Sequence, residues 1–227
     1  MQTTAIELES GAMRSSRVAA LFPMPVAAAE MGDAVQVPLV LAEERQYLRC
    51  ALPGRRRDFA AGRACARHAV AMLGSGGTIG RHGDGGPRWP EGIMGSISHT
   101  EGLCAAVACR IGKHIGLGLD VERLSPLDDE VLDEYCTAPE RSFLDALPAR
   151  NSQVMAIALF SAKEALYKCQ HPLTGRWLEF RDVTLRLRTG GGIELAGWPA
   201  AVADLHFAGR YRIEDEHVMT GFWAWRS

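Results

Sequence analysis

The sequence predicts an α+β protein built from two similar lobes, each with a small antiparallel sheet packed against one long helix. Two observations support this prediction. An amphipathic helix pattern occurs once in each half of the 227 residues, and short apolar runs typical of antiparallel strands accompany each helix. We expect an N-terminal lobe over residues 17–124 and a C-terminal lobe over residues 125–227, joined near Leu124–Pro126 and each of roughly 100 residues. Residues 1–16 are polar and aperiodic, which predicts a mobile N-terminus.

In the N-terminal half, residues 17–40 are compatible with a strand and loops, and residues 39–49 have helical character. The first long helix is expected over Arg55–Leu73, where apolar residues recur at helical spacing and Gly74 provides a stop. Residues 75–93 are rich in glycine and are expected to form a loop.

Three short strands are expected to follow that loop. Gly95–His99 and Leu103–Cys109 are joined by Thr100-Glu101-Gly102, which predicts a hairpin. Ile111–Val121 has alternating apolar residues and is expected to form a further strand.

The C-terminal half repeats this order of elements. A short acidic segment lies between Pro126 and Pro139, and the second long helix is expected over Asn151–Gln170. Alternating apolar residues then predict strands over residues 183–187 and 193–195, and a hairpin over Tyr211–Trp225 that turns near residues 214–217.

Composition excludes several functional classes. The chain has 25 basic and 27 acidic residues and a formal net charge of −2, which argues against nonspecific binding to nucleic acid or to a membrane surface. No apolar run reaches the ~18 residues of a membrane span, and we see no secretory signal pattern at the start. The six cysteines are dispersed and lack metal-binding spacing, which favours free thiols in a cytoplasmic protein.

One strand carries acidic residues on a single face. In the run Gly116–Glu122, Leu117, Leu119 and Val121 share one face, whereas Gly116, Gly118, Asp120 and Glu122 share the other. Two carboxylates beside two glycines form an acidic shelf with open space, which suits a hard cation such as Mg²⁺ together with a substrate phosphate. Taken alone, the pattern favours an ordinary acidic strand end by about two to one over a metal site.

The second long helix holds a third carboxylate. Glu164 and Lys168 are four residues apart and lie on one helix face, and as a surface ion pair they would contribute only ~0.3–0.5 kcal/mol. Placed near Asp120 and Glu122, Glu164 would instead complete a metal site with Lys168 beside it. Lys163 points about 100° away from Glu164 around the helix axis.

Two further groups have the chemistry to bind an anion. Arg56, Arg63 and Arg67 fall within a narrow arc of the first helix, where they form either a phosphate-binding stripe or a solvated basic edge. His99 follows small polar residues at a strand end and either binds phosphate or is structural. The patterns G-x-S-x-G, the P-loop and G-x-G-x-x-G between a strand and a helix are absent.

Taken together, these segments resemble the Sfp-type 4′-phosphopantetheinyl transferases, in order and in spacing, across residues 40–185. The pattern is most similar to the bacterial subgroup that includes enterobactin-type and actinobacterial enzymes, and Pro172–Leu178 resembles that subgroup as well. The matching segments are Phe59, Arg63 and Arg67 of the first helix, Gly86–Pro90, Gly95–His99, Gly118–Glu122 and Phe160–Lys168.

The resemblance implies a monomer with two lobes related by a pseudo-twofold axis and an active site between them. It implies Mg²⁺-dependent transfer of phosphopantetheine from coenzyme A to a serine of an acyl, peptidyl or aryl carrier protein, with release of adenosine 3′,5′-bisphosphate. By that resemblance Asp120, Glu122 and Glu164 are Mg²⁺ ligands, and Glu164 and Lys168 are catalytic. The implied coenzyme-binding residues are Arg55, Arg56, Arg63, Arg81, Ser98, His99, Lys163 and Lys168.

Two alternatives to the enzyme remain open at this point. One is a non-catalytic module that binds coenzyme A or a nucleotide, and the other is a carrier-binding scaffold whose site has decayed. The second requires a lost carboxylate, whereas all three are present. The carrier and its pathway (fatty acid, polyketide, nonribosomal peptide or siderophore synthesis) are not specified by the sequence.

Overall fold

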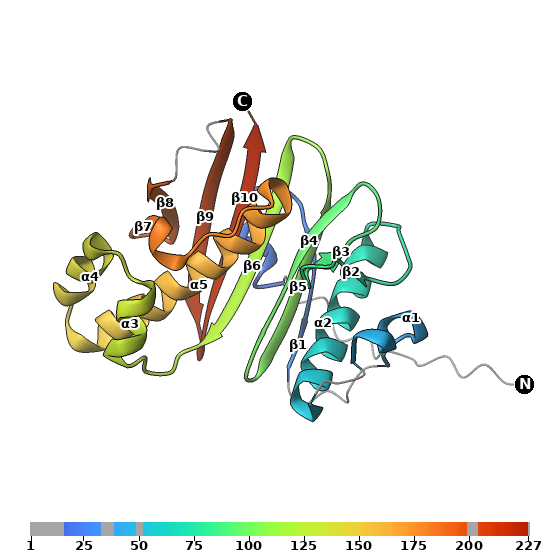
Figure 1. Ribbon diagram of the computed structural model, residues 1–227, viewed down its shortest axis with the longest axis horizontal. Coiled ribbons are helices and arrows are strands. Elements are labelled where there is room, and N and C mark those ends of the chain that lie inside the picture. The colour runs from blue at the N-terminus through green and yellow to red at the C-terminus, as the bar shows by residue number, and fades with distance from the viewer. Residues whose placement is uncertain (1–15, 33–38, 49–51, 199–203, 227) are drawn as a thin grey trace, which may run out of the picture.

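The computed structural model describes residues 16–32, 39–48, 52–198 and 204–226. The predicted mobile segment 1–16 lies almost wholly outside the described residues. In the N-terminal half, three antiparallel strands form a sheet in the order β1-β5-β4. These strands are β1 (Ala27–Met31), β4 (Ile93–Thr100) and β5 (Leu103–Arg110), and helix α2 (Pro53–Met72) packs against their sheet, as Figure 1 shows.

The C-terminal half forms a five-stranded antiparallel sheet in the order β6-β10-β9-β8-β7. Helix α5 (Ala149–Thr174) packs against this sheet (Figure 1) and ends at Gly175, whose φ of 63° is the left-handed conformation that favours glycine. The prediction of an α+β protein with one sheet and one long helix in each half is therefore confirmed. The strands are β6 (His114–Arg123), β7 (Thr184–Leu187), β8 (Gly192–Gly197), β9 (Leu205–Glu214) and β10 (His217–Arg226).

Shorter elements connect these parts. The expected helix over residues 39–49 is a single turn of α-helix followed by a 3-10 turn, and the expected loop over residues 75–93 contains a two-stranded ribbon. The acidic segment before Pro139 forms a helix that the sequence pattern does not predict. The elements are η1 (Ala19–Leu21), α1 (Ala42–Arg45), η2 (Gln46–Leu48), β2 (Gly80–Arg81), β3 (Pro87–Arg88), α3 (Asp129–Tyr135), α4 (Ala138–Asp145) and η3 (Phe180–Asp182).

Strand β6 stands at the junction of the two halves. It pairs antiparallel with β10 over its length, so it belongs to the C-terminal sheet, although a lobe boundary near residue 124 would assign it to the N-terminal lobe. The change of sheet therefore falls between β5 and β6. In Figure 1, β6 lies next to β4, the edge strand of the other sheet.

The predicted alternation along β6 is confirmed. Leu117, Leu119 and Val121 are buried in a core that includes residues of both sheets. The opposite face of β6 meets α5, and Gly118 lies so close to the helix that an added Cβ would overlap the carbonyl oxygen of Ala165. Both glycines on this face let helix and strand approach, and Gly116 also lines the cleft between the two halves, whereas the sequence alone suggested that both open space for a ligand.

Replacing Gly118 by Ala is expected to destabilise the fold by about 1–3 kcal/mol or more, because the new methyl group must push α5 away from β6. Denaturant unfolding measures the change. Gly112→Ala is the matched control, since a Cβ at Gly112 has no heavy atom within 4 Å. Equal stability of the two variants would contradict this account of the packing.

Candidate functional site

A cleft with a volume of about 1310 Å³ lies between the two halves. One wall comes from α2, the β2–β3 ribbon and β4 of the N-terminal half, and the other from β6 and α5. Most of the predicted site residues line this cleft, although they are far apart in the sequence. Those that do are Arg55, Arg63, Arg81, Ser98, His99, Asp120, Glu122, Glu164 and Lys168.

Arg63 is the central cation of the α2 wall. Its side chain is buried, its guanidinium lies over the ring of Phe59 at 4.7 Å, and its Nη2 donates a hydrogen bond to the carbonyl of Gly80 at 3.1 Å. Its Nε is buried and has no hydrogen-bond partner among the described residues. A buried donor on a cation without a partner favours an anionic ligand at this point.

Arg55 and the other two arginines of the predicted stripe, Arg56 and Arg67, differ in role. Arg55 lines the cleft, whereas Arg56 is not part of its lining. Arg67 pairs with the fully buried carboxylate of Glu44 at 2.6 Å and also donates to the carbonyl of Leu39. Arg67 therefore holds the segment around α1 against α2, and that segment contributes Tyr47 to the cleft.

His99 and Arg81 complete the basic side of the cleft. The pKa of His99 is lowered by the packing around its ring and by the nearby charges of Arg55 and Lys168, while Asp58 and Asp120 act in the opposite direction. Arg81 is exposed, and its Nε donates to the carbonyl of Gly85 at 3.1 Å, so the glycine loop orients this side chain.

Three carboxylates lie together on the wall of the cleft that β6 and α5 form. Asp120 and Glu122 come from alternate positions of β6, and Glu164 comes from α5. Burial and the neighbouring charge of Asp120 raise the pKa of Glu122 to about 7. Burial also raises the pKa of Glu164, Lys168 lowers it and Asp120 raises it further. A bound cation would relieve repulsion of this kind.

Lys168 organises this acidic side. Its Nζ lies 2.6 Å from Oδ1 of Asp120 and donates to Oγ of Ser98 at 3.1 Å. Oδ2 of Asp120 is buried and has no hydrogen-bond partner among the described residues. Within that part of the chain no three metal-binding side chains already converge on one point. The orphaned oxygen and the two carboxyls with raised pKa values nevertheless fit a divalent cation.

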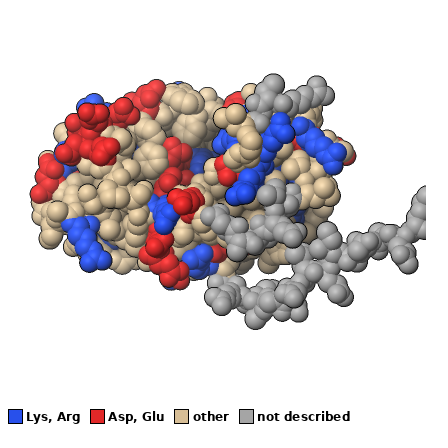
Figure 2. All heavy atoms as spheres, turned by 90° about the horizontal axis from the view of Figure 1, so that it is seen from below, with Lys and Arg blue, Asp and Glu red and all other residues tan. Residues whose placement is uncertain are grey.

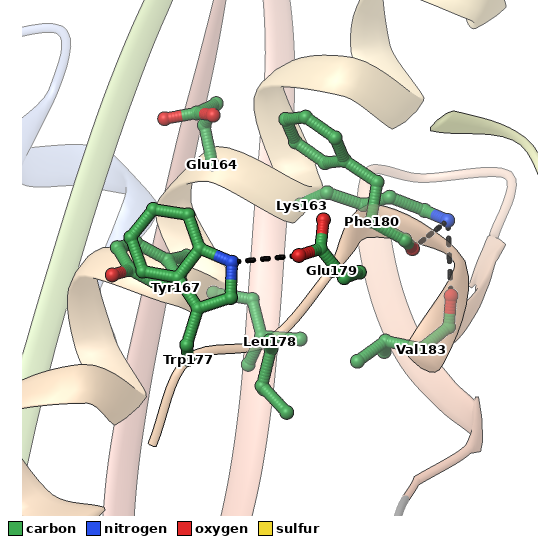
Figure 3. A pocket seen from close by; sticks show the side chains of 9 residues that line it. Lys163, Glu164, Tyr167, Trp177, Leu178, Glu179, Phe180 and Val183 are labelled. Carbon is green, nitrogen blue, oxygen red and sulfur yellow. Dashed lines mark hydrogen bonds between the residues drawn. The ribbon is translucent and has the colours of Figure 1, made fainter. Parts of the chain in front are cut away.

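Lys163 does not line this cleft and lines only the smaller cavity that adjoins it, so its ammonium is not placed among the basic groups of the cleft as predicted. Its ammonium lies 2.7 Å from Oε2 of Glu140 and donates to the carbonyls of Tyr135, Phe180 and Val183. The side chain is 2% exposed. Figure 3 shows Lys163 and Glu164, neighbours in α5, pointing to different sides of the helix.

The network around Lys163 was missed by the sequence reading. Glu140 caps α4 by accepting hydrogen bonds from the backbone and the hydroxyl of Thr137, and its Oε1 accepts from the N–H of Leu185. The signal for it is the capping box T-x-x-E at residues 137–140. Glu140 and Lys163 together fix α4 and the start of β7 against the helix that carries Glu164.

A second, smaller cavity of about 390 Å³ adjoins the cleft, and Figure 3 shows it at close range. Glu164 and Tyr167 line both spaces, so they form the wall between them. Trp177 is 71% exposed, packs edge-on against Tyr167 and donates to Oε1 of Glu179 at 2.9 Å. The sequence pattern did not single out this aromatic pair.

Charge is unevenly distributed over the surface. Figure 2 shows acidic side chains gathered at the end of the molecule formed by α3 and α4, and basic side chains on the opposite half. At the acidic end, Arg141 pairs with Asp129, Asp133 and Asp145, and Asp128, Glu130 and Glu134 are exposed. No helix in the described part of the chain is long and apolar enough to cross a membrane.

Comparison with known proteins identifies the family. Residues 43–109 match the model of the 4′-phosphopantetheinyl transferase N-terminal domain, and residues 116–221 match that of the 4′-phosphopantetheinyl transferase superfamily. The two matches meet between β5 and β6, where the structure changes sheet.

Several curated relatives agree with these matches. The 4′-phosphopantetheinyl transferase Npt of Nocardia iowensis is 32% identical over 88% of this chain and 96% of its own length. The corresponding transferases Svp of Streptomyces mobaraensis and PptT of Mycobacterium tuberculosis are 37% and 36% identical over 69% and 70% of this chain, and over 64% and 68% of their own lengths. Enterobactin synthase component D of Salmonella typhi is 32% identical over 53% of this chain and 50% of its own length. The chain belongs to the 4′-phosphopantetheinyl transferase superfamily, as its sequence motifs predicted.

Proposed function

We propose that this protein transfers the phosphopantetheine group of coenzyme A to a serine of a carrier protein and releases adenosine 3′,5′-bisphosphate. The observation that carries the proposal is the cleft itself. Basic side chains line the wall of the N-terminal half, and three carboxylates with Lys168 line the other. A diphosphate substrate and a cation need these two kinds of surface facing each other.

Arg55, Arg63, Arg81 and His99 are assigned to the phosphates of coenzyme A. The unpartnered Nε of Arg63 supports this assignment, as does the shared lining of the cleft. A bound phosphate would stabilise the protonated form of His99 and reverse the lowering of its pKa. The apolar cavity beyond Glu164 offers space for the pantetheine arm.

Asp120, Glu122 and Glu164 are assigned as the ligands of Mg²⁺. When bound, Mg²⁺ would neutralise the diphosphate and polarise the phosphorus that is attacked. Oδ2 of Asp120, which is buried without a partner among the described residues, supports this assignment. Lys168 holds Oδ1 of the same carboxylate and keeps it fixed.

The chemical step needs a base and a stabilised leaving group. The serine oxygen forms a bond to the phosphorus of the phosphopantetheine, the bond to the bisphosphate breaks, and the serine proton passes to Glu164 directly or through a water. Glu164 accepts no hydrogen bond from any described residue, so its carboxylate is available for this proton. Lys168 stabilises or protonates the departing bisphosphate.

The partner is expected to be an acyl, peptidyl or aryl carrier domain of acidic, helical character. Such a domain would be repelled by the acidic end at α3 and α4, so docking is expected nearer the basic half (Figure 2). The name of the enterobactin synthase relative supports a carrier of siderophore synthesis as one candidate. Both walls of the cleft come from one chain, which supports action as a monomer.

A panel of apo-carrier domains tests the proposal against its alternatives. Each domain is incubated with the protein, coenzyme A and Mg²⁺, and its intact mass is measured. A mass gain of one phosphopantetheine on a carrier supports the enzyme, and the preferred carrier names the pathway. Binding of coenzyme A without any mass gain would indicate a coenzyme-binding module, and binding of carriers alone would indicate a scaffold.

Mg²⁺ binding is expected to strengthen as the pH rises through about 7. Because the pKa of Glu122 is raised to about 7, the carboxyl holds a proton below that pH, and the cation must displace it. In the metal-free protein the same raised pKa means that the folded state binds a proton that the unfolded chain has lost. The stability contributed by this group therefore falls as the pH rises from the unfolded-state pKa towards about 7.

Calorimetric titration with Mg²⁺ at about pH 6 and about pH 8 measures the effect, since these values bracket the pKa. Glu122→Gln is the control, because an amide has no proton to release over this range. An Mg²⁺ affinity that is the same at both pH values in the unmodified protein would contradict the assignment of Glu122.

A further inference from the structure

Two edge strands meet where the halves of the molecule join, and backbone hydrogen bonds do not pair them. Strand β4 pairs with β5, and strand β6 pairs with β10. Instead, hydroxyl groups on β4 accept hydrogen bonds from the backbone N–H groups of β6. The three contacts are Leu119 N to Ser96 Oγ at 2.9 Å, Val121 N to Ser98 Oγ at 3.2 Å and Arg123 N to Thr100 Oγ1 at 3.2 Å.

The period of two on both strands makes this ladder regular. Ser96, Ser98 and Thr100 are alternate residues of β4, so their side chains share one face, and the N–H groups they bind are alternate groups of β6. Each hydroxyl accepts a hydrogen bond that a backbone carbonyl of a neighbouring strand would otherwise accept. The hydroxyl ladder, meaning Ser96, Ser98 and Thr100, therefore joins the two sheets and satisfies an edge that would otherwise lie unpaired.

Ser98 also donates a hydrogen bond to a carboxylate, which Ser96 does not. Its hydroxyl donates to Oδ1 of Asp120 at 2.8 Å, whereas the Ser96 hydroxyl donates to the backbone carbonyl of Leu119 at 3.4 Å. A hydroxyl has one proton and two acceptor lone pairs. Ser98 uses all three, because it also accepts from Val121 N and from Nζ of Lys168 at 3.1 Å.

The hydrogen bonds of the Ser98 hydroxyl argue against the expected binding of coenzyme by this side chain, although Ser98 lines the cleft. Its single proton is donated to Asp120, so donation to a phosphate would leave Oδ1 of that carboxylate to Lys168 alone. Ser98 and Lys168 both hold Oδ1, while Oδ2 is left buried and unpartnered among the described residues. The pair therefore fixes the rotation of the carboxylate and leaves one defined oxygen for a ligand.

We propose that Ser98 is a positioning residue that ties the junction of the two sheets to the orientation of Asp120. The hydroxyl ladder holds β4 and β6 at a fixed separation. The hydrogen bond from Ser98 to Asp120 couples the orientation of that carboxylate to this separation. The inference rests on the proposed function, in which Asp120 is a ligand of a divalent cation.

The experiment compares Ser98→Ala with Ser96→Ala. Each variant removes one buried hydroxyl, 4% and 3% exposed respectively, and each leaves one N–H of β6 without its acceptor. Only Ser98→Ala also removes a hydrogen bond to the Asp120 carboxylate, which Lys168 then holds alone. Ser96→Ala therefore measures what the loss of one contact of the ladder does by itself.

Mn²⁺ binding, followed by electron paramagnetic resonance without coenzyme or carrier, is the first readout, and steady-state kinetics is the second. Both variants are expected to melt at a similarly lowered temperature. Ser98→Ala alone is expected to lose about tenfold in Mn²⁺ affinity and about tenfold in kcat, with KM for coenzyme A within about twofold of the unmodified protein. Should Ser98→Ala fail to fold, Ser98→Cys fills the same space with a weaker donor and is expected to show the same losses.

Three results would overturn the proposal. They are equal Mn²⁺ affinity in Ser96→Ala and Ser98→Ala, a rise in KM for coenzyme A with unchanged kcat in Ser98→Ala, and no Mn²⁺ binding by the unmodified protein. Failure of the proposed function is distinguishable from these. It would appear as normal Mn²⁺ binding by the unmodified protein without modification of any carrier.

Discussion

Replacing Glu164 by Gln is expected to lower kcat for carrier modification by about 10²–10⁴-fold, the usual cost of losing a general base. The amide keeps the shape of the side chain but cannot accept the serine proton, and it is a poorer ligand for a cation. The fold should be unaffected, because no described residue donates a hydrogen bond to this carboxylate. Lower repulsion among Glu164, Asp120 and Glu122 should even raise the thermal stability of the metal-free protein.

Glu91→Gln is the matched control, since Glu91 is an exposed carboxylate in the turn before β4 and is not part of the cleft lining. Initial rates of carrier modification, measured by intact mass, give kcat, and a thermal melt reports the fold. Near-full activity of Glu164→Gln would rule out the role of this residue as base and as cation ligand.

Lys163→Met is expected to cost about 3–5 kcal/mol of folding stability, because it leaves the carboxylate of Glu140 buried without its partner. Burial lowers the pKa of Lys163, and Glu140 offsets part of this lowering, so the charged lysine depends on its partner. The carbonyls of Tyr135, Phe180 and Val183 lose their donor in the same variant. Denaturant unfolding measures the loss, with the exposed Lys113→Met as control.

The double variant Lys163→Met/Glu140→Gln separates the pair from its surroundings. Its loss of stability is expected to be smaller than the sum of the two single losses, because removing both charges leaves neither one uncompensated. If Lys163→Met keeps its stability and instead raises KM for coenzyme A, then Lys163 binds coenzyme after all, and the network described here is not its main role.

Sequence periodicity predicted the elements that carry the site. The alternation in residues 116–122 placed Asp120 and Glu122 on one face of β6, and the spacing of Glu164 and Lys168 placed both on one face of α5. Periodicity does not show which helix or strand packs against each of these faces. Gly118 meets α5 rather than a ligand, and the alternation along β6 does not show that this helix covers that face.

The two assignments that the structure argues against have the same physical origin. Lys163 and Ser98 match coenzyme-binding positions by sequence, but a side chain donates only as many hydrogen bonds as it has protons. The protons of both are used within the protein. The three protons of Lys163 are shared among Glu140 and three backbone carbonyls, and the one proton of Ser98 goes to Asp120. Only the folded chain shows which donors remain for a ligand.

The intact mass of an apo-carrier domain after incubation with this protein, coenzyme A and Mg²⁺ tests directly whether the cleft transfers phosphopantetheine. We expect the carrier to gain one phosphopantetheine at its serine and adenosine 3′,5′-bisphosphate to appear in equal amount, whereas a carrier with Ala in place of that serine stays unmodified. If the protein binds coenzyme A but leaves every carrier of a broad panel unmodified and releases no bisphosphate, the assignment of this cleft to phosphopantetheine transfer is wrong.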